Sequence, residues 1–168
     1  LTAGFERVGW QDMTEVDRQY PVLLDAYAKD IASLTVFYPG ALAAVAILRK
    51  AGYAVSICTN KPEALAVQLL EALGATDAFD ALVGADTLSV RKPDPAPLWA
   101  AVDRAGGDRG RVCLIGDTIT DRNTAANADV HSVLVTFGPS GADMAALGPA
   151  ATLQDFADLP KLVTQLIG

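Results

Sequence analysis

The chain has 168 residues, 51% of them hydrophobic, so it can bury a sizeable core in one domain or in one domain with a small appendage. Its net charge of −7 argues against a nucleic-acid partner, because contacts to the phosphate backbone need a basic surface. No apolar run is long enough to cross a bilayer, and the mixed first residues do not resemble a signal peptide. We therefore expect neither a nucleic-acid nor a membrane partner.

Helical and strand patterns follow one another along most of the chain. Apolar residues recur at threes and fours from about Met13 to Leu34, which predicts a helix, and Pro39-Gly40 then breaks the chain. Strands are expected at residues 54–58, 81–85, 112–116, 132–137 and 151–153. Helices are expected at residues 41–52, from Pro62 to Gly74, from Asp94 to Gly106, after Asp121 and from Pro160.

The predicted strands are apolar throughout and alternate with helices. This pattern is typical of a parallel sheet that helices cover on both faces. We therefore predict an α/β protein with a Rossmann-like three-layer core. The early helical segment has no strand within it, so we expect a separate helical element beside that core.

Both cysteines of the chain, Cys58 and Cys113, lie in apolar runs that are predicted to be buried strands. Two reduced thiols in a protein core are expected of a cytoplasmic protein.

Two predicted strands end in clusters of polar residues. Thr59-Asn60 follows residues 54–58, and Asp117 follows residues 112–116, with Asp121 four residues later. Ligands bind beyond the carboxyl ends of the strands in an open parallel sheet. Both clusters therefore lie at the edge where a site would form.

Lys92 lies between these clusters and is followed by Pro93, which favours an extended backbone at the lysine. Each feature also has a purely structural interpretation. Thr59-Asn60 could form a turn, Lys92 could be a solvated surface lysine, and the two acids could be a helix cap and a first-turn acid.

The ordered combination favours phosphate chemistry, because phosphoryl transfer needs charge stabilisation on the phosphoryl oxygens. Carboxylates bind Mg²⁺, while a lysine and a small hydroxyl can complete the phosphate site. The three groups should then converge on one crevice.

Three segments resemble the second, third and fourth motifs of the haloacid dehalogenase superfamily. They read ICTNKPEAL, VRKPDPAPL and IGDTITDRNTAANAD. FYPGALAAVAILRKAGY and VLVTFG resemble stretches of its phosphoglycolate phosphatases, and the resemblance covers the chain from Tyr38 to Gly138. It implies a core of that superfamily's fold with a helical cap.

The resemblance also implies a role for each motif residue. Thr59 and Lys92 would act in catalysis, and Thr59, Asn60 and Lys92 would hold the phosphoryl group, Asn60 through its backbone. Asp117 would bind Mg²⁺ directly, and Asp121 would support the metal directly or through water.

The activity implied is Mg²⁺-dependent hydrolysis of a small phosphorylated metabolite through an aspartyl phosphate, with 2-phosphoglycolate the first candidate. A sugar-phosphate phosphatase or a mutase of the same superfamily is the first alternative, and a non-catalytic pseudoenzyme is the second. Dehalogenation is less favoured because it needs no metal, and a receiver-like signalling domain would lack the cap. The oligomeric state stays open.

One motif of the superfamily, Asp-x-Asp followed by Gly-Thr, does not occur in this sequence. It supplies the nucleophile and the general acid on a first strand that lies between the strands ending at Asn60 and Asp117. We therefore expect residues 1–37 to be the remainder of a helical cap and residues 38–168 to be a core that lacks its first strand. Asp129 stands where the family often has glycine, and we expect little effect from it.

A gap at the first strand would leave backbone groups unpaired on two strands. Each buried unpaired group costs roughly 1–3 kcal/mol, against a typical domain stability of about 5–15 kcal/mol. The expectation is therefore that a leading segment with Asp-x-Asp exists and that the 168 residues alone do not fold natively.

Overall fold

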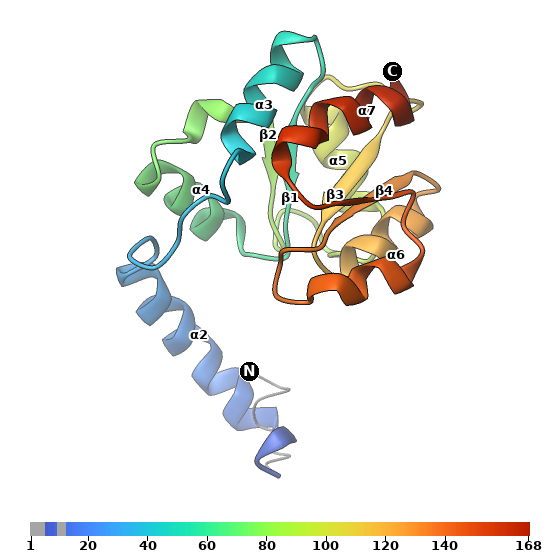
Figure 1. Ribbon diagram of the computed structural model, residues 1–168. Helices are drawn as coiled ribbons and strands as arrows, with labels where there is room; N and C mark the ends of the chain where they lie inside the picture. Colours follow the sequence, from blue (N-terminus) through green and yellow to red (C-terminus); the bar gives the residue numbers. More distant parts are fainter. Residues whose placement is uncertain (1–5, 10–12) are drawn as a thin grey trace. The chain divides into compact units, whose positions relative to one another are not determined.

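The computed structural model describes residues 6–9 and 13–168, and the chain forms two compact units, Leu1–Thr35 and Val36–Gly168 (Figure 1). In the first unit, helix α2 spans Met13–Lys29 and ends five residues before the predicted Leu34. Turns follow it, with the Asp30 N–H donating to the Tyr27 carbonyl. That this unit is the remainder of a cap stays a prediction.

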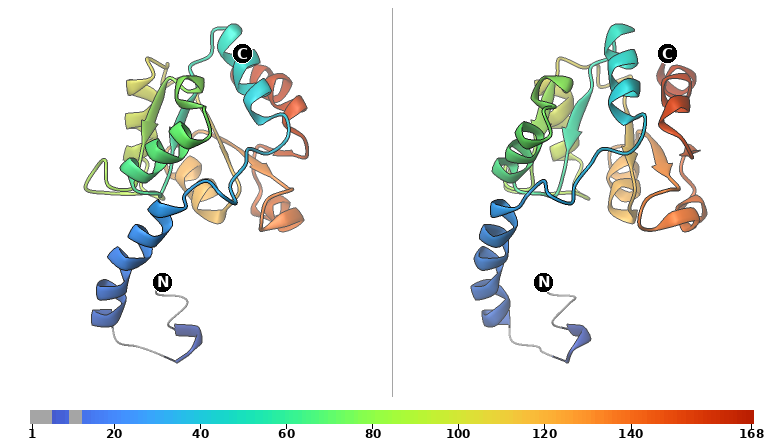
Figure 2. Two further views of the ribbon diagram at one scale, coloured as in Figure 1. Left: turned by 90° about the vertical axis from the view of Figure 1, so that its left-hand side faces the viewer. Right: turned by 60° about the vertical axis from the view of Figure 1, so that its left-hand side comes forward.

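Five strands of the second unit all pair in parallel, as predicted for an α/β protein. They are β1 (Ser56–Cys58), β2 (Ala81–Val83), β3 (Cys113–Gly116), β4 (His131–Val135) and β5 (Ala151–Leu153). β1 pairs with β2 in one sheet, and β3, β4 and β5 form a second sheet in that order (Figure 2).

The first strand is shorter than predicted because a side chain replaces part of its backbone pairing. The prediction began at Ala54, whereas β1 begins at Ser56. The Val55 N–H donates to an Asp80 carboxylate oxygen at 2.8 Å, and the Asp80 N–H donates to the Val55 carbonyl at 2.8 Å. Pairing with the second strand therefore continues one residue further through a side chain.

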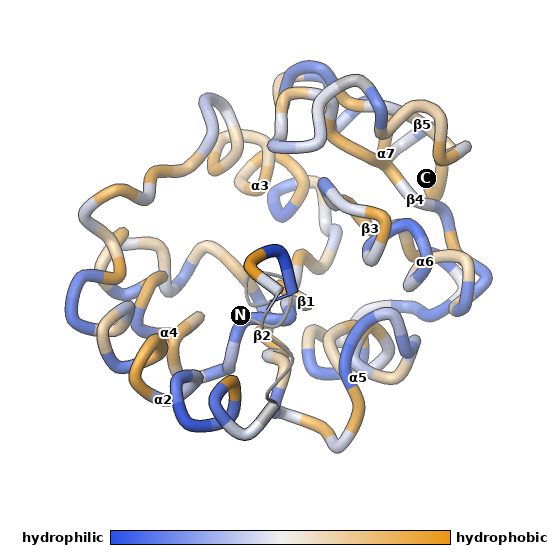
Figure 3. Tube along the Cα trace, turned by 90° about the horizontal axis from the view of Figure 1, so that it is seen from below, coloured by the Kyte–Doolittle hydropathy of each residue, from blue (hydrophilic) through white to orange (hydrophobic). Residues whose placement is uncertain are grey.

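Helices cover both faces of the strands. α3 and α7 lie on one side and α5 and α6 on the other, which gives the predicted three layers (Figure 3). The helices of this unit are α3 (Ala41–Lys50), α4 (Glu63–Ala72), α5 (Ala96–Arg104), α6 (Ile119–Asn127) and α7 (Leu159–Ile167).

Alternating residues of β3 pack into two hydrophobic clusters, one on each face of the sheet. Leu114 packs with α5 and α6, while its neighbours Cys113 and Ile115 pack with the cluster on α3 and α7. This is the two-residue periodicity of a strand buried on both faces. The buried residues of the cluster on α3 and α7 are Ala44, Leu48, Val133, Val135, Leu153, Leu159 and Val163.

β1 and β3 do not pair with each other, as the sequence analysis expected. In the described part of the chain, β1 pairs only with β2, and β3 pairs only with β4. The polar residues that follow β1 and β3 therefore come from two separate sheets.

Asp129 has a left-handed backbone, with φ of 54°, just after α6. The Val130 N–H reaches back to the Ala125 carbonyl at 3.0 Å, which is the Schellman ending that usually carries glycine at this position. A left-handed backbone costs most residues other than glycine roughly 1–2 kcal/mol, and aspartate and asparagine less. Glycine at this position loses part of its advantage because it makes the unfolded chain more flexible.

Asp129→Gly should therefore raise the free energy of unfolding by about 0.5–1 kcal/mol. Denaturant titration of the variant and the wild type measures this change. Asp129→Val should lower stability instead, because a β-branched residue tolerates this backbone poorly. Equal stability of the glycine and valine variants would contradict the strain.

Candidate active site

Lys92 and Asp121 form a largely buried ion pair. The Lys92 Nζ donates to Asp121 Oδ1 at 2.6 Å, and the two side chains are 10% and 9% exposed. Burial alone would raise the pKa of Asp121, but the charge and hydrogen bond of Lys92, together with bonds from Thr118 and the Asp117 N–H, lower it below its ordinary value. Asp121 is therefore a stable anion that holds the lysine amine in place.

The second oxygen of Asp121 is used to begin helix α6. Asp121 Oδ2 accepts from the Thr118 N–H at 3.1 Å, the Thr118 hydroxyl at 2.7 Å and the Asp117 N–H at 3.2 Å. Thr118 and Asp121 form a capping box, so the helix begins at Ile119. The prediction that this helix follows Asp121 was wrong, because the threonine provides the cap three residues earlier.

The backbone approaches the acids closely at Gly116, the last residue of β3. A Cβ atom at Gly116 would overlap the side chain of Asp121, so only glycine fits without displacing that carboxylate. Gly138 lies near the other acid, since a Cβ there would be 3.2 Å from the Cβ of Asp117.

Thr59 and Asn60, at the end of β1, have different tasks. The Thr59 N–H continues the pairing with β2 by donating to the Val83 carbonyl at 2.9 Å, and its hydroxyl accepts from the Lys61 N–H at 3.1 Å. The Asn60 amide donates to the Lys92 carbonyl at 3.0 Å. Sequence reasoning gave Asn60 only a backbone role and missed this contact.

Asn127, the last residue of α6, also contacts the lysine segment. Its amide donates to the Pro93 carbonyl at 2.9 Å. Nothing in the sequence singled out Asn127, because an exposed asparagine at a helix end is an ordinary feature. The Lys92–Pro93 peptide bond between the two contacted carbonyls is cis.

The structure brings the five predicted residues together at one edge of the sheets. Asp121 contacts Lys92 and the Asp117 backbone, and Asn60, next to Thr59, contacts Lys92. The Lys92 amine forms its ion pair with Asp121 rather than with Asp117. The roles of these residues in substrate and metal binding stay predictions.

Asp117 is the carboxylate best suited to a metal. It is half-buried, and its carboxylate has no hydrogen-bond or ion-pair partner among the described residues. Mg²⁺ is commonly held by one or two carboxylates together with water and substrate oxygens, so Asp117 fits as one ligand.

Asp121 Oδ2 already accepts three hydrogen bonds and Oδ1 accepts one from Lys92, so Asp121 has less free acceptor capacity for a metal than Asp117. Residues 6–9 and 13–168 contain no group of three or more acidic, histidine or cysteine side chains that could hold a metal ion. The ligand set that these residues provide is therefore partial.

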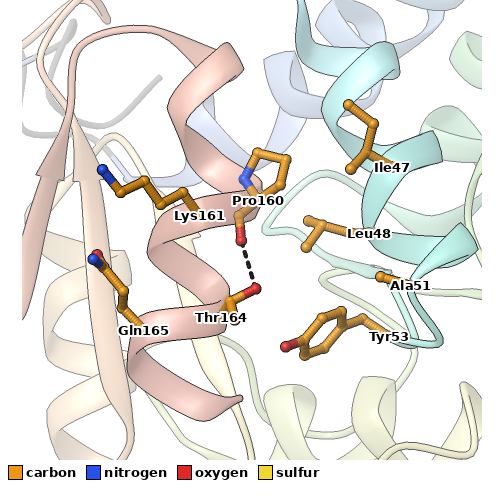
Figure 4. A pocket seen from close by; sticks show the side chains of 8 residues that line it. All are labelled: Ile47, Leu48, Ala51, Tyr53, Pro160, Lys161, Thr164 and Gln165. Carbon is orange, nitrogen blue, oxygen red and sulfur yellow. Dashed lines mark hydrogen bonds between the residues drawn. The ribbon is translucent and has the colours of Figure 1, made fainter.

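The described residues line at least two hollows near these elements. One of about 350 Å³ lies between α3 and α7 and is mainly apolar (Figure 4). Its lining residues are Ile47, Leu48, Ala51, Tyr53, Pro160, Lys161, Thr164 and Gln165. Another, of about 570 Å³, borders the lysine segment and is lined by Ala85, Ser89, Val90, Arg91, Pro93 and Asp94. Only the second lies next to the candidate site.

A family model described as haloacid dehalogenase-like hydrolase matches residues 3–135 of the chain. The chain belongs to this family. The match includes Thr59, Lys92, Asp117 and Asp121, so it confirms the resemblance on which the sequence analysis relied.

Relatives of this haloacid dehalogenase-like hydrolase are phosphoglycolate phosphatases. The chain is 41% identical over 157 residues to the one from Mesorhizobium japonicum, covering 93% of this chain and 69% of the relative. It is also 41% identical over 156 residues to the one from Rhodospirillum rubrum, covering 93% of this chain and 65% of the relative.

A solved structure of a candidate phosphoglycolate phosphatase from Lactobacillus delbrueckii subsp. bulgaricus has the same fold. It matches with a TM-score of 0.83 and 27% identity, covering 90% of this chain and 64% of that chain. The chain thus spans about two thirds of the length of the proteins it matches.

The two cysteines of the chain are free and partly buried, and they are poor nucleophiles. Burial raises the pKa of Cys113 to about 11. Burial also raises the pKa of Cys58, more than the nearby Lys92 charge lowers it. Because the thiolate is the reactive form, neither side chain suggests a thiol mechanism. No helix in the described ranges is both long and apolar enough to span a membrane.

Proposed function

We propose that this protein hydrolyses a small phosphorylated metabolite with the help of Mg²⁺, in the cytoplasm, and that 2-phosphoglycolate is the first substrate to test. The observation that carries the proposal is the buried Lys92–Asp121 pair next to Asp117, whose carboxylate has no partner in the described chain. Relatives named phosphoglycolate phosphatase, at 41% identity, support the choice of substrate.

Each side chain would have a separate task in this reaction. Lys92, held by Asp121, would place a positive charge against the phosphoryl oxygens, where negative charge is spread during transfer. The Thr59 hydroxyl would donate a hydrogen bond to the same group. Asp117 would hold the metal, which would neutralise phosphoryl charge from another side.

The nucleophile is proposed to lie on a strand between β1 and β3. The Thr59 N–H faces β2, so the alternation of a strand directs the N–H and carbonyl of Cys58 away from β2. A strand paired there would satisfy these groups. It would also place the residues at its carboxyl end between Thr59 and Asp117. An Asp-x-Asp sequence on that strand would supply the nucleophile and the general acid of an aspartyl-phosphate mechanism.

Purified full-length protein should release inorganic phosphate from 2-phosphoglycolate and from p-nitrophenyl phosphate when Mg²⁺ is present. EDTA should abolish the release, because the metal neutralises charge in the transition state. A colorimetric phosphate assay measures both reactions. A sugar phosphate hydrolysed much faster than 2-phosphoglycolate would point to a sugar-phosphate phosphatase.

The second candidate function is a non-catalytic protein of the same fold. It is favoured by the lack of an Asp-x-Asp motif followed by Gly-Thr in these 168 residues. Failure of the full-length protein to hydrolyse any phosphomonoester would support this candidate and reject the proposed enzyme.

A further inference from the structure

The segment that carries Lys92 is held at three points by side chains from two other parts of the fold. Asn60 donates to the Lys92 carbonyl at 3.0 Å, and Asn127 donates to the next carbonyl, that of Pro93, at 2.9 Å. The Lys92 amine donates to Asp121 at 2.6 Å. Both ends of the lysine, its backbone and its charged tip, are therefore fixed.

Two of these three contacts come from one rigid element, helix α6. Asp121 lies in its first turn, and Asn127 is its last residue. They are six positions apart in the sequence, which corresponds to about 9 Å along the helix axis. The length of α6 therefore fixes the distance between the two residues that hold the lysine segment. One end holds the backbone of the lysine segment, and the other end holds the lysine amine.

We infer that Asn127 is a positioning residue for Lys92. It acts through the Pro93 carbonyl and does not touch the substrate. The inference rests on the proposed function, in which the lysine amine meets the phosphoryl group. Without the Asn127 contact, the backbone around Lys92 and Pro93 would sample other conformations. The Lys92 amine would then be hydrogen-bonded to Asp121 for a smaller fraction of the time.

The contact requires a hydrogen-bond donor at position 127. A carbonyl accepts hydrogen bonds, so its partner must donate, as the asparagine NH₂ group does. An aspartate of the same shape would place an acceptor against the carbonyl. Asn127 is exposed, so water can replace its hydrogen bond, and the loss should be moderate.

Helix α6 offers a matched control in Asn123, one turn before Asn127. Asn123 is also exposed, and within the described part of the chain its side chain makes no hydrogen bond. Asn127→Ala should lower kcat for phosphomonoester hydrolysis by roughly threefold to tenfold, the worth of one ordinary hydrogen bond, with a smaller change in KM. Asn123→Ala should leave both constants nearly unchanged. Asn127→Asp should reduce kcat at least as much as Asn127→Ala.

A second measurement does not depend on activity. The Lys92 ammonium, paired and largely buried, should give a slowly exchanging NH₃⁺ signal in ¹H–¹⁵N spectra of the full-length protein. The signal is assigned by its disappearance in Lys92→Met. Asn127→Ala and Asn127→Asp should speed its exchange with water severalfold, whereas Asn123→Ala should not.

Wild-type protein without phosphatase activity would reject the proposed function, and the ammonium signal alone would then decide the role of Asn127. A signal in Asn127→Ala that exchanges as slowly as in Asn123→Ala would overturn the inference. So would equal kcat values in these two variants of an active enzyme.

Discussion

Asp121→Asn should lower the free energy of unfolding by about 3 kcal/mol, because it removes one partner of a buried ion pair. Asparagine has one oxygen, whereas Asp121 uses two: one accepts from Lys92 and the other from Thr118 and the Asp117 N–H. In either orientation, the new NH₂ group would face a donor. Denaturant unfolding of the full-length variant and wild type measures the loss.

A double-mutant cycle with Lys92→Met identifies the cause of that loss. The double variant should be more stable than Asp121→Asn alone, since it no longer buries an unpaired ammonium. The exposed pair Asp103–Arg109, with side chains 53% and 57% exposed, is the matched control. Asp103→Asn should cost much less stability than Asp121→Asn, because water screens an exposed ion pair. Equal losses at Asp103 and Asp121 would contradict the importance of burial.

The same pair predicts how stability depends on pH. The pKa of Asp121 is lower in the folded protein than in the unfolded chain, so its stabilising effect is fully present above the unfolded pKa of about 3.9. The effect is lost as pH falls through the still lower folded pKa. The stability difference between wild type and Asp121→Asn should therefore be constant near neutral pH and shrink only below about pH 4.

Asp117→Asn should reduce Mg²⁺-dependent hydrolysis by roughly a hundredfold or more, because it removes the charge of the carboxylate proposed to hold the metal. Stability should not fall. The Asp117 carboxylate has no partner to lose among the described residues, and its removal relieves repulsion with the neighbouring Asp121. Kinetics at several Mg²⁺ concentrations, with denaturant unfolding alongside, measure both effects.

Asp129→Asn serves as the control for Asp117→Asn, since it removes the same charge and asparagine tolerates the left-handed backbone of that position. It should leave hydrolysis nearly unchanged. Activity that survives both Asp117→Asn and EDTA would instead indicate a metal-free mechanism.

The sequence analysis predicted the alternating strands and helices well because burial patterns are local. The apolar runs just before Thr59 and Asp117 marked β1 and β3, and the polar residues that follow them marked the edge where the candidate site lies. The predicted starts of β1 and α6 were less accurate, because in each case a side chain accepts a hydrogen bond from a backbone N–H group. Asp80 does so for the start of β1, and Thr118 for the start of α6.

The sequence by itself determined the α/β class and the family, because these depend on periodicity and on residue types at set spacings. Its list of site residues stays a prediction. Which residue contacts which was decided only by the tertiary structure. Lys92 is 29 residues from Asp121 in sequence, and Asn127 is 34 residues from Pro93, so no local pattern links either pair. The packing of α6 against β3 and β4 brings these side chains to the lysine segment and selects Asp121, rather than Asp117, as the partner of the amine.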